Sequence, residues 1–254
     1  MAEIYETLKR CLNQEQLVAL ATVIAGKGLG QKLLIWPDGR TVGSLGPAEL
    51  NEQVIRYAAN LLDAQEPGRA AFDVGDETVE IFIDVYPPPP KLIIVGAVHI
   101  AVPLVTFANT MGFKTIVIDA RSAFATRERF PHVDELIVEW PSKALARMRL
   151  DEATYLVVLS HDEKLDNPAL QVALGRPLRY VGALGSTKTH AKRVKALGQM
   201  GITDEQLARI HAPVGLDLGA RSPQEIALAI MAEIVAVRHG IGSRQPSPMS
   251  QPPA

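Results

Sequence analysis

Three features of the sequence predict an α/β protein. We expect a C-terminal Rossmann-like parallel sheet with helices on both faces, preceded by a small α+β domain. The first feature is the apolar run Lys91–Val95, which leads directly into Gly96 and is typical of a strand buried on both faces. The second is a helical repeat of apolar residues after His99, and the third is another apolar run, Lys114–Asp119, which ends in an acid. Together they predict a βαβ unit of the kind found in dinucleotide-binding folds.

The glycine pattern of dinucleotide-binding folds, G-x-G-x-x-G/A, is incomplete at this turn. Gly96 and Ala101 occupy its first and last positions, but Val98 stands at the middle one. The middle glycine allows a pyrophosphate to approach the backbone, and a valine side chain crowds that approach. The pattern therefore predicts the fold, whereas dinucleotide binding depends on the room that Val98 leaves.

Residues 1–86 are expected to form the small α+β domain. A helix is expected over Ala2–Leu12, and a second helix follows Pro47, because proline is favoured at the first helical position. Strands are expected at Leu17–Ala25, Lys32–Trp36, Ala70–Val74 and Glu77–Tyr86. Four consecutive prolines, residues 87–90, predict a stiff interdomain linker.

The second domain, residues 91–240, continues with further strands and capped helices. Strands are expected at Glu135–Trp140, Ala153–Ser160 and Arg179–Leu184. Helices are expected at Asn167–Leu174, at Thr187–Met200, and after the capping boxes that begin at Thr203 and Ser222. The last of these helices is apolar almost all round, which predicts that it is buried, in part between subunits of a homo-oligomer. Residues 241–254 are rich in Gly, Ser, Gln and Pro, which predicts a disordered tail.

Composition and charge exclude several classes of function. The formal net charge of the 254 residues is −2, and no basic cluster indicates nucleic-acid binding. The charged N-terminal segment is unlike a signal peptide, and the longest apolar run, Ile226–Val237, is too short to span a bilayer. The single cysteine, Cys11, excludes an internal disulfide and a multi-cysteine metal site. We therefore expect a cytoplasmic protein without a membrane anchor.

Polar residues and glycines cluster after the predicted strands of the second domain. In an open parallel sheet the ligand lies outside the carboxyl ends of the strands. The candidate cofactor site therefore comprises Gly96, Val98, His99, Asp119, Arg121, His161, Asp162, Gly185, Ser186, Lys188, Asp217 and Arg221. Asp119 stands where dinucleotide folds hold a ribose, and Lys188 stands near a helix N-terminus that could meet a phosphate. No catalytic triad, P-loop, paired-carboxylate or metal-ligand pattern is visible, so no catalytic or metal-binding residue is predicted.

Several of these residues have simpler structural explanations, which the sequence leaves open. His99 could cap its helix, His161 and Asp162 could form a turn, and Asp217 could cap its loop. The basic residues of the helix after Ser186 could be a solvated face: Lys188, Lys192, Arg193 and Lys195. The residues by themselves predict an α/β ligand-binding protein and go no further.

Five segments, in order along the chain, carry a resemblance to a known family. They are Val95–Ala101, Ile118–Pro131, Val157–Asp162, Tyr180–Ser186 and Pro213–Ile226. They resemble the XdhC/CoxI family, the accessory factors of xanthine dehydrogenase and related molybdenum hydroxylases. The resemblance covers Lys91–Val237 closely and the N-terminal part more weakly.

The resemblance implies a chaperone rather than an enzyme. Such a two-domain protein binds molybdenum cofactor transiently, as molybdopterin or as its dinucleotide form, and aids its sulfuration or insertion. The implied partners are an apo molybdenum hydroxylase, of the xanthine dehydrogenase, aldehyde oxidase or CO dehydrogenase type, and a cysteine desulfurase.

The sequence departs from the family pattern at four places. The family's Gly-Gly-Gly-Cys is Gly46-Pro47-Ala48-Glu49 here, and its Cys-Gly-Gly is missing from Val74–Thr78. The loop after the first strand is shortened to Gly26–Gly30, and Val98 replaces the fingerprint glycine. A thiolate would be the soft ligand for molybdenum or sulfur, and neither cysteine position provides one. Two alternatives therefore stay open: an NAD(P)-binding oxidoreductase, and a divergent family member that acts only as an interaction scaffold.

Overall fold

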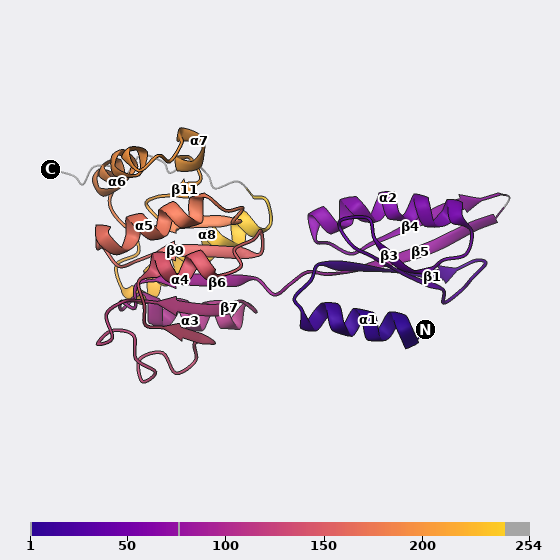
Figure 1. The fold of residues 1–254 in the computed structure, drawn as a ribbon, viewed down its shortest axis with the longest axis horizontal. Coiled ribbons are helices and arrows are strands. Elements are labelled where there is room, and N and C mark those ends of the chain that lie inside the picture. Colours follow the sequence, from indigo (N-terminus) through magenta and orange to yellow (C-terminus); the bar gives the residue numbers. More distant parts are fainter. Residues whose placement is uncertain (1, 76, 242–254) are drawn as a thin grey trace. The chain divides into compact units, whose positions relative to one another are not determined.

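The computed structural model describes residues 2–75 and 77–241. Contacts between residues divide the chain into two compact units (Figure 1), one ending at Pro88 and the other beginning at Pro89. The boundary lies inside the run of four prolines. Each unit is described by itself. The tail expected at residues 241–254 lies, apart from Ile241, outside the described residues.

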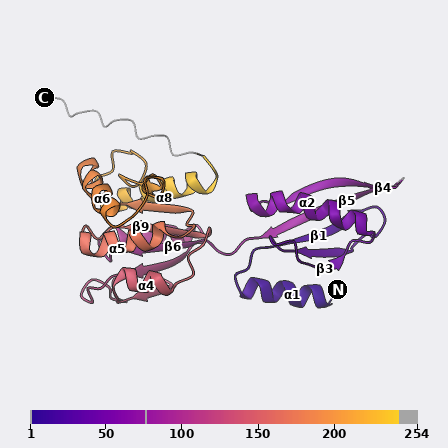
Figure 2. The same ribbon diagram turned by 45° about the horizontal axis from the view of Figure 1, so that its top comes forward.

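The first unit is an antiparallel sheet with one helix on each face (Figure 2). Its elements are α1 (Ala2–Asn13), β1 (Val18–Ala25), β2 (Lys32–Ile35), β3 (Thr41–Ser44), α2 (Ala48–Ala64), β4 (Gly68–Val74) and β5 (Glu77–Tyr86). The strand order is β3-β2-β1-β5-β4. Helix α2 buries Leu50 and Val54 against one face, and α1 buries Cys11 against the other. The edge strand β3 was not predicted, because its short sequence has no alternating apolar pattern.

The second unit contains a six-stranded sheet in which all neighbouring strands are parallel. Its elements are β6 (Lys91–Val95), α3 (Ala101–Thr110), β7 (Lys114–Ile118), β8 (Glu135–Ile137), α4 (Pro141–Arg147), β9 (Thr154–Val158), α5 (Glu163–Leu174), β10 (Tyr180–Ala183), α6 (Thr187–Gln199), α7 (Asp204–Leu207), β11 (Ile210–His211) and α8 (Pro223–Arg238). Counted from β6, the order β8-β7-β6-β9-β10-β11 is the 3-2-1-4-5-6 order of Rossmann folds. The predicted fold class is confirmed.

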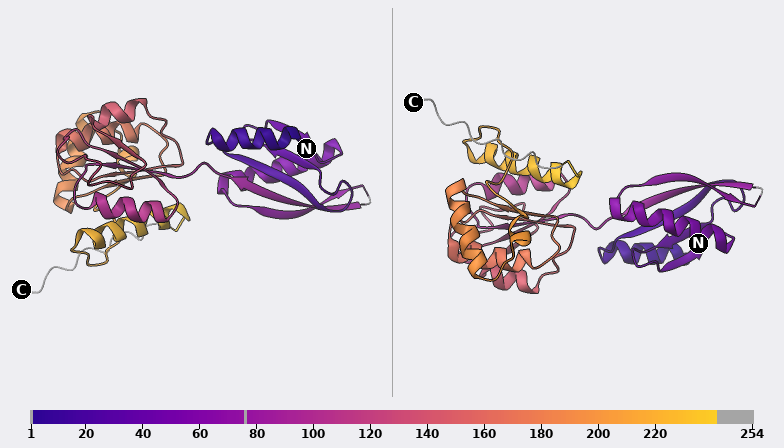
Figure 3. Two further views of the ribbon diagram at one scale, coloured as in Figure 1. Left: turned by 90° about the horizontal axis from the view of Figure 1, so that it is seen from below. Right: turned by 90° about the horizontal axis from the view of Figure 1, so that it is seen from above.

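Helices cover both faces of this sheet, as the continuous apolar strands predict. Figure 3 shows α3 and α8 together on one side and α4, α5 and α6 on the other. Ile94 of β6 belongs to the core under α3 and α8, whereas its neighbours Ile93 and Val95 belong to the opposite core. All three side chains are completely buried, so both faces of the strand are shielded from solvent.

The order of the strands places the topological switch point of the sheet between β6 and β9. From β6 the chain continues through α3 to β7, which pairs with one edge of β6. The strand β9 pairs with the other edge of β6. Ligands of Rossmann folds bind at this switch point, outside the carboxyl ends of the strands. Here Gly96 has a φ of +105°, and a Cβ on it would lie 2.7 Å from the Ser160 backbone nitrogen. Glycine is therefore required because the loop after β9 passes directly against it.

Some sequence predictions for the second unit were wrong in detail. The helix expected at Asn167 begins earlier, at Glu163, and Pro168 lies inside it. The earlier start is possible because the Asp162 carboxylate accepts a hydrogen bond of 2.9 Å from the backbone nitrogen of Lys164 and so caps the helix. In the single chain Leu228 of α8 is 47% exposed, so the burial of that face between subunits stays a prediction. Among residues 2–75 and 77–241, no helix combines the length and the apolar character needed to cross a membrane.

Candidate functional site

A cleft of about 250 Å³ opens at the carboxyl end of the second unit's sheet. Three loops line it: the loop from β6 to α3, the loop from β9 to α5, and the loop that precedes α8 together with the first turn of that helix. The lining residues are Val98, His99, Ile100, His161, Arg221, Pro223 and Ile226. Four of these, Val98, His99, His161 and Arg221, belong to the set predicted from the sequence. We call this feature the rim cleft.

The first loop presents side chains to the rim cleft, because its backbone is already engaged by the protein. The Ala97 nitrogen donates to Asp119 Oδ2 at 2.8 Å, and the Ala97 carbonyl accepts from Arg129 Nη1 at 2.9 Å. In a dinucleotide-binding fold the backbone of this loop approaches the pyrophosphate. Here the partly buried Val98 and the exposed His99 face the ligand space instead.

Asp119 supports the first loop and is not available to a ligand in this structure. Its side chain is completely buried and accepts hydrogen bonds from Ala97 and from Arg121, whose backbone nitrogen and guanidinium both donate at 2.8–2.9 Å. Burial works to raise the pKa of Asp119, but these hydrogen bonds outweigh it and hold that pKa below its usual value. In this structure the Asp119 carboxylate therefore positions the first loop, and the predicted ribose contact stays a prediction, since a ribose would have to compete with bonds already formed.

The Arg121 side chain is held in place by its hydrogen bonds to Asp119. Its guanidinium carbon also lies 4.5 Å from the centroid of the Phe124 ring, and its side chain is 34% exposed. The pair with Asp119 raises the pKa of Arg121 further, so the guanidinium is always charged. Asp119 and Arg121 together clamp the β6–α3 loop.

The second loop holds His161 in an unusual backbone conformation. Its φ is +59°, in the left-handed region that non-glycine residues adopt rarely and at some cost in energy. The preceding Ser160 is locked: its Oγ donates to Asp166 Oδ1 at 2.6 Å and accepts from the Asp162 nitrogen at 3.1 Å. A strained residue at a strand end, facing a cleft, supports a functional role for His161 over a plain turn.

The third loop places Arg221 at the mouth of the rim cleft. The carboxylate of Glu225 accepts hydrogen bonds of 2.9 Å from the backbone nitrogens of Ser222 and Arg221, as the predicted capping box requires. These two bonds, that of Ser222 first, lower the pKa of Glu225. The Arg221 guanidinium itself forms no ion pair with any described residue, so it is free to bind an anion.

The other predicted residues lie outside the rim cleft. Asp162 caps α5, and Asp217 Oδ1 accepts from the Gly219 nitrogen at 3.4 Å, which is the simpler structural role the sequence left open. Gly185, Ser186 and Lys188 form the turn from β10 into α6, at the same edge of the sheet but one strand beyond β9. The apolar lining residues Ile100, Pro223 and Ile226 were not predicted, because nothing local distinguishes them from core positions.

The rim cleft combines two imidazoles and one guanidinium with apolar walls. Such a surface can hold a flat, partly apolar molecule that carries an anionic group. Within the described part of the chain, no three His, Cys, Asp or Glu residues are placed to hold a metal ion. By the chemistry of its lining residues, the rim cleft is a candidate binding site for such a molecule.

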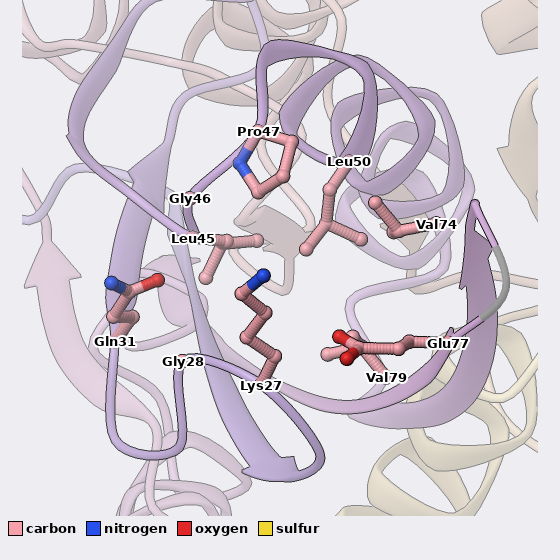
Figure 4. Close-up of a pocket in the computed structure, with 10 residues that line it drawn as sticks. All are labelled: Lys27, Gly28, Gln31, Leu45, Gly46, Pro47, Leu50, Val74, Glu77 and Val79. Carbon is pink, nitrogen blue, oxygen red and sulfur yellow. The ribbon is translucent and has the colours of Figure 1, made fainter.

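A second cavity, of about 140 Å³, lies in the first unit (Figure 4). Lys27 projects toward its centre, with Leu45 and Leu50 on one side and Glu77 on the other. The complete lining is Lys27, Gly28, Gln31, Leu45, Gly46, Pro47, Leu50, Val74, Glu77 and Val79. Three segments that depart from the family pattern, Gly26–Gly30, Gly46–Glu49 and Val74–Thr78, thus contribute to one cavity. No thiol lines it.

Comparisons with known proteins agree with this architecture. Residues 92–234 match the family described as the XdhC Rossmann domain, and residues 11–73 match the XdhC and CoxI family. A Bacillus halodurans structure described as a xanthine dehydrogenase has the same fold, with a TM-score of 0.55, 22% identity, and coverage of 92% of this chain and 95% of its own. That likeness concerns the fold alone.

Three curated relatives are similar in sequence. Uncharacterized protein YqeB of Escherichia coli is 27% identical over 237 residues, which is 87% of this chain and 43% of the relative. A probable xanthine dehydrogenase subunit from Bacillus subtilis is 35% identical over 163 residues, 64% of this chain and 47% of the relative. The molybdenum cofactor insertion chaperone PaoD of Escherichia coli is 38% identical over 95 residues, 37% of this chain and 30% of the relative.

This chain thus spans less than half the length of each of these curated relatives. The match to the XdhC Rossmann domain nevertheless covers more than half of the chain, and the second match adds most of the first unit. The chain belongs to the XdhC/CoxI family.

Proposed function

We propose that this protein assists the maturation of a molybdenum hydroxylase by binding molybdenum cofactor at the rim cleft and aiding its insertion into the apo-enzyme. The observation that carries the proposal is the convergence of His99, His161 and Arg221 from three separate loops on one cleft at the Rossmann switch point. Among the relatives, PaoD is named a molybdenum cofactor insertion chaperone. The apo molybdenum hydroxylase is accordingly the proposed partner.

The chemistry of the cleft suits part of this cofactor. A pterin is flat and carries hydrogen-bonding edges, and molybdopterin ends in a phosphate. Ile100 and Ile226 offer apolar contact, the two histidines offer hydrogen bonds, and Arg221 offers a charge for an anionic group. At about 250 Å³ the cleft is smaller than most complete ligand sites, so the remainder of the cofactor would extend along the rim.

Any sulfur for the cofactor must come from another protein. The only cysteine of the chain, Cys11, is 2% exposed and packs against Val18 and Leu34 in the first unit. A buried thiol in apolar surroundings is a poor nucleophile and a poor sulfur carrier. If sulfuration is assisted, this protein presents the cofactor and a cysteine desulfurase supplies the sulfur.

Two alternative functions remain testable. An NAD(P)-dependent oxidoreductase is favoured by the 3-2-1-4-5-6 strand order, although Val98 and the engaged Ala97 amide leave little room for a pyrophosphate. A scaffold that binds no cofactor is favoured by the altered cavity of the first unit, which lacks the thiols that the family resemblance implies.

The test is to extract the purified protein for co-purified pterin and to titrate it with molybdopterin, NAD(H) and NADP(H). We expect saturable molybdopterin binding that weakens about tenfold in Arg221→Ala, because a charge-assisted hydrogen bond is lost. The matched control is Arg147→Ala, an exposed arginine of α4 outside the cleft, which should bind as the wild type does. Absence of pterin binding together with no effect on reconstitution of an apo-hydroxylase would refute the proposal.

A Val98→Gly substitution tests whether the valine restricts the rim cleft. We expect severalfold tighter binding of molybdopterin or of a dinucleotide, because the side chain that crowds the β6–α3 loop is removed. Ile226→Ala serves as the control, since it enlarges the same cleft without changing that loop, and it should not tighten binding. Unchanged affinity in Val98→Gly would mean that the valine is not the obstacle.

A further inference from the structure

The turn from β10 into α6 has the character of an anion site. Helix α6 is 13 residues long, and Ser186 caps it by accepting a hydrogen bond of 3.2 Å from the Thr189 nitrogen. The backbone N–H groups of Thr187 and Lys188 open the helix, so they have no partner within it and carry the positive end of its dipole. The first turn contains no acid. By contrast, the neighbouring helix α5 begins with acidic residues and would repel an anion.

A buried arginine lies directly beneath this turn. Arg193, whose helix face was interpreted from the sequence as solvated, is only 6% exposed. Its side chain folds back along α6, and its Nη2 donates to the Leu184 carbonyl at 3.0 Å. Its Nη1 is buried, and no described residue provides a hydrogen-bond partner for it. That nitrogen lies 3.8 Å from where a Cβ on Gly185 would stand, so it is next to the turn.

The charge of Arg193 is only partly compensated by the protein. Asp166 Oδ2 lies 3.8 Å from Nη2, beyond hydrogen-bond distance, while Asp166 Oδ1 is taken by the Ser160 hydroxyl. Glu163 also acts on Arg193 and is itself exposed. A buried guanidinium donor without a partner is destabilising and calls for an explanation such as a bound ion. A ligand anion at the turn would supply the missing negative charge.

Gly185 lets the turn pass close to the side chains of α6. Its φ is +143°, and a Cβ there would lie 3.0 Å from Thr189 Cγ2 and 3.8 Å from Arg193 Nη1. β10 pairs directly with β9, and His161 of the rim cleft follows β9, so the turn and the cleft are separated by roughly one or two strand spacings of about 5 Å. One elongated ligand can reach both.

We propose that the amides of Thr187 and Lys188, together with the buried Arg193, form a phosphate subsite at the start of α6. This rests on the proposed function, because the subsite would hold the phosphate or pyrophosphate of the ligand whose flat part occupies the rim cleft. Lys188 lies at the same turn and adds an exposed positive charge. The subsite takes the place of the first Rossmann loop, in which the Ala97 amide is already used.

The experiment titrates the full chain with inorganic phosphate and with pyrophosphate, followed by ³¹P NMR line broadening and calorimetry. Arg193→Gln removes the buried charge, and we expect it to weaken phosphate binding at least about tenfold. Thr187→Pro removes one amide donor but keeps the helix, since proline suits the first helical position and Ser186 already has a compatible ψ of 164°. It should weaken binding severalfold. Lys195→Gln, an exposed lysine farther along α6, is the control and should have no effect.

The outcomes separate this subsite from the proposed function. If the protein binds phosphate through Arg193 and Thr187 but binds no pterin, the phosphate subsite is supported and the cofactor role is refuted. Molybdopterin binding that is unchanged in both variants would keep the cofactor role and overturn the subsite. No saturable binding of phosphate or pyrophosphate to the folded wild-type protein at millimolar concentrations would also overturn it. Circular dichroism of each variant confirms folding, and the mild Thr187→Pro change remains informative if Arg193→Gln does not fold.

Discussion

Replacing Asp119 by alanine should lower the free energy of unfolding of the second unit by about 3 kcal/mol. It should also lower the affinity of any ligand that binds at the rim cleft. Removing one partner of a buried ion pair typically costs about 3–5 kcal/mol. We expect the lower end because Arg121 is 34% exposed and can turn to water. The Ala97 amide, in contrast, is completely buried and would lose its acceptor. Urea unfolding at neutral pH measures the change.

Acid titration gives this prediction an independent signature. The pKa of Asp119 is held below its usual value, so the folded state keeps the carboxylate ionised where the unfolded chain would bind a proton. The stabilisation is therefore fully present above the ordinary aspartate pKa of 3.8 and is lost as the pH falls through the lower folded value. In Asp119→Ala the free energy of unfolding should no longer fall with the protonation of this carboxylate.

The first unit contains a matched control for Asp119. Asp38 binds Arg40 with the same spacing, accepting from its Nε at 2.6 Å and from its backbone nitrogen at 3.1 Å, but both side chains are exposed. Asp38→Ala should leave the unfolding midpoint almost unchanged, since exposed pairs contribute little. If the two substitutions had equal effects, burial would not be what makes the Asp119 clamp important.

The sequence predicted the sheet well because its strands are locally recognisable. Continuous apolar runs located β6, β7, β9 and β10, and two capping boxes located the starts of α7 and α8. The strands β3 and β11 were missed because they are only four and two residues long, which is too short for a periodic pattern to develop. Pro168 misled the prediction for α5, since the side-chain cap at Asp162 overrides the local preference for proline at a helix start.

The candidate site was predictable where it depends on topology and unpredictable where it depends on packing. His99 and His161 follow strands that are neighbours in a Rossmann sheet, so their meeting could be inferred from the fold class alone. The capture of Asp119 by Arg121 and Ala97 depends on side-chain packing that no local pattern encodes. Arg193 was misassigned for a similar reason: its burial results from α6 packing beside Asp166, far away in the sequence.

Replacing Glu233 by alanine should destabilise the second unit by about 3 kcal/mol or more, because each buried donor that loses its acceptor costs about 1–3 kcal/mol. In the sequence Glu233 only interrupts an apolar helix, but in the structure it is 6% exposed and connects α8 to β10, to β11 and to the loop between β11 and α8. Its Oε2 accepts from the Tyr180 hydroxyl on β10 and from the Gly215 nitrogen at 2.9 Å, and its Oε1 lies 3.4 Å from His211 Nδ1. The substitution would leave the buried Tyr180 hydroxyl without an acceptor.

The acid dependence again identifies the group. Burial acts to raise the pKa of Glu233, but the hydrogen bonds from His211, Tyr180 and Gly215 bring it below its usual value. Burial, followed by the nearby Glu233 charge, raises the pKa of Tyr180 well above its ordinary value, so the phenol stays a donor. The stabilisation is thus present above the ordinary glutamate pKa of 4.5 and is lost as the pH falls through the lower folded value. When urea unfolding is measured between neutral and acid pH, the free energy of unfolding of Glu233→Ala should fall less steeply than that of the wild type as the pH is lowered.

Glu233 also connects stability to the site. Gly215 lies in the loop between β11 and α8 that also contains Arg221, so losing its bond to Glu233 should loosen the segment that brings the guanidinium to the rim cleft. We expect faster hydrogen exchange across residues 214–222 in Glu233→Ala and weaker ligand binding, whereas the exposed control Leu228→Ala should change neither. A double-mutant cycle with Tyr180→Phe separates the contribution of the Tyr180 hydrogen bond from that of the Gly215 hydrogen bond, because the single Phe variant keeps the Gly215 bond. If exchange in the loop rose equally in Tyr180→Phe and Glu233→Ala, packing of α8 on β10 rather than the Gly215 bond would be what positions Arg221.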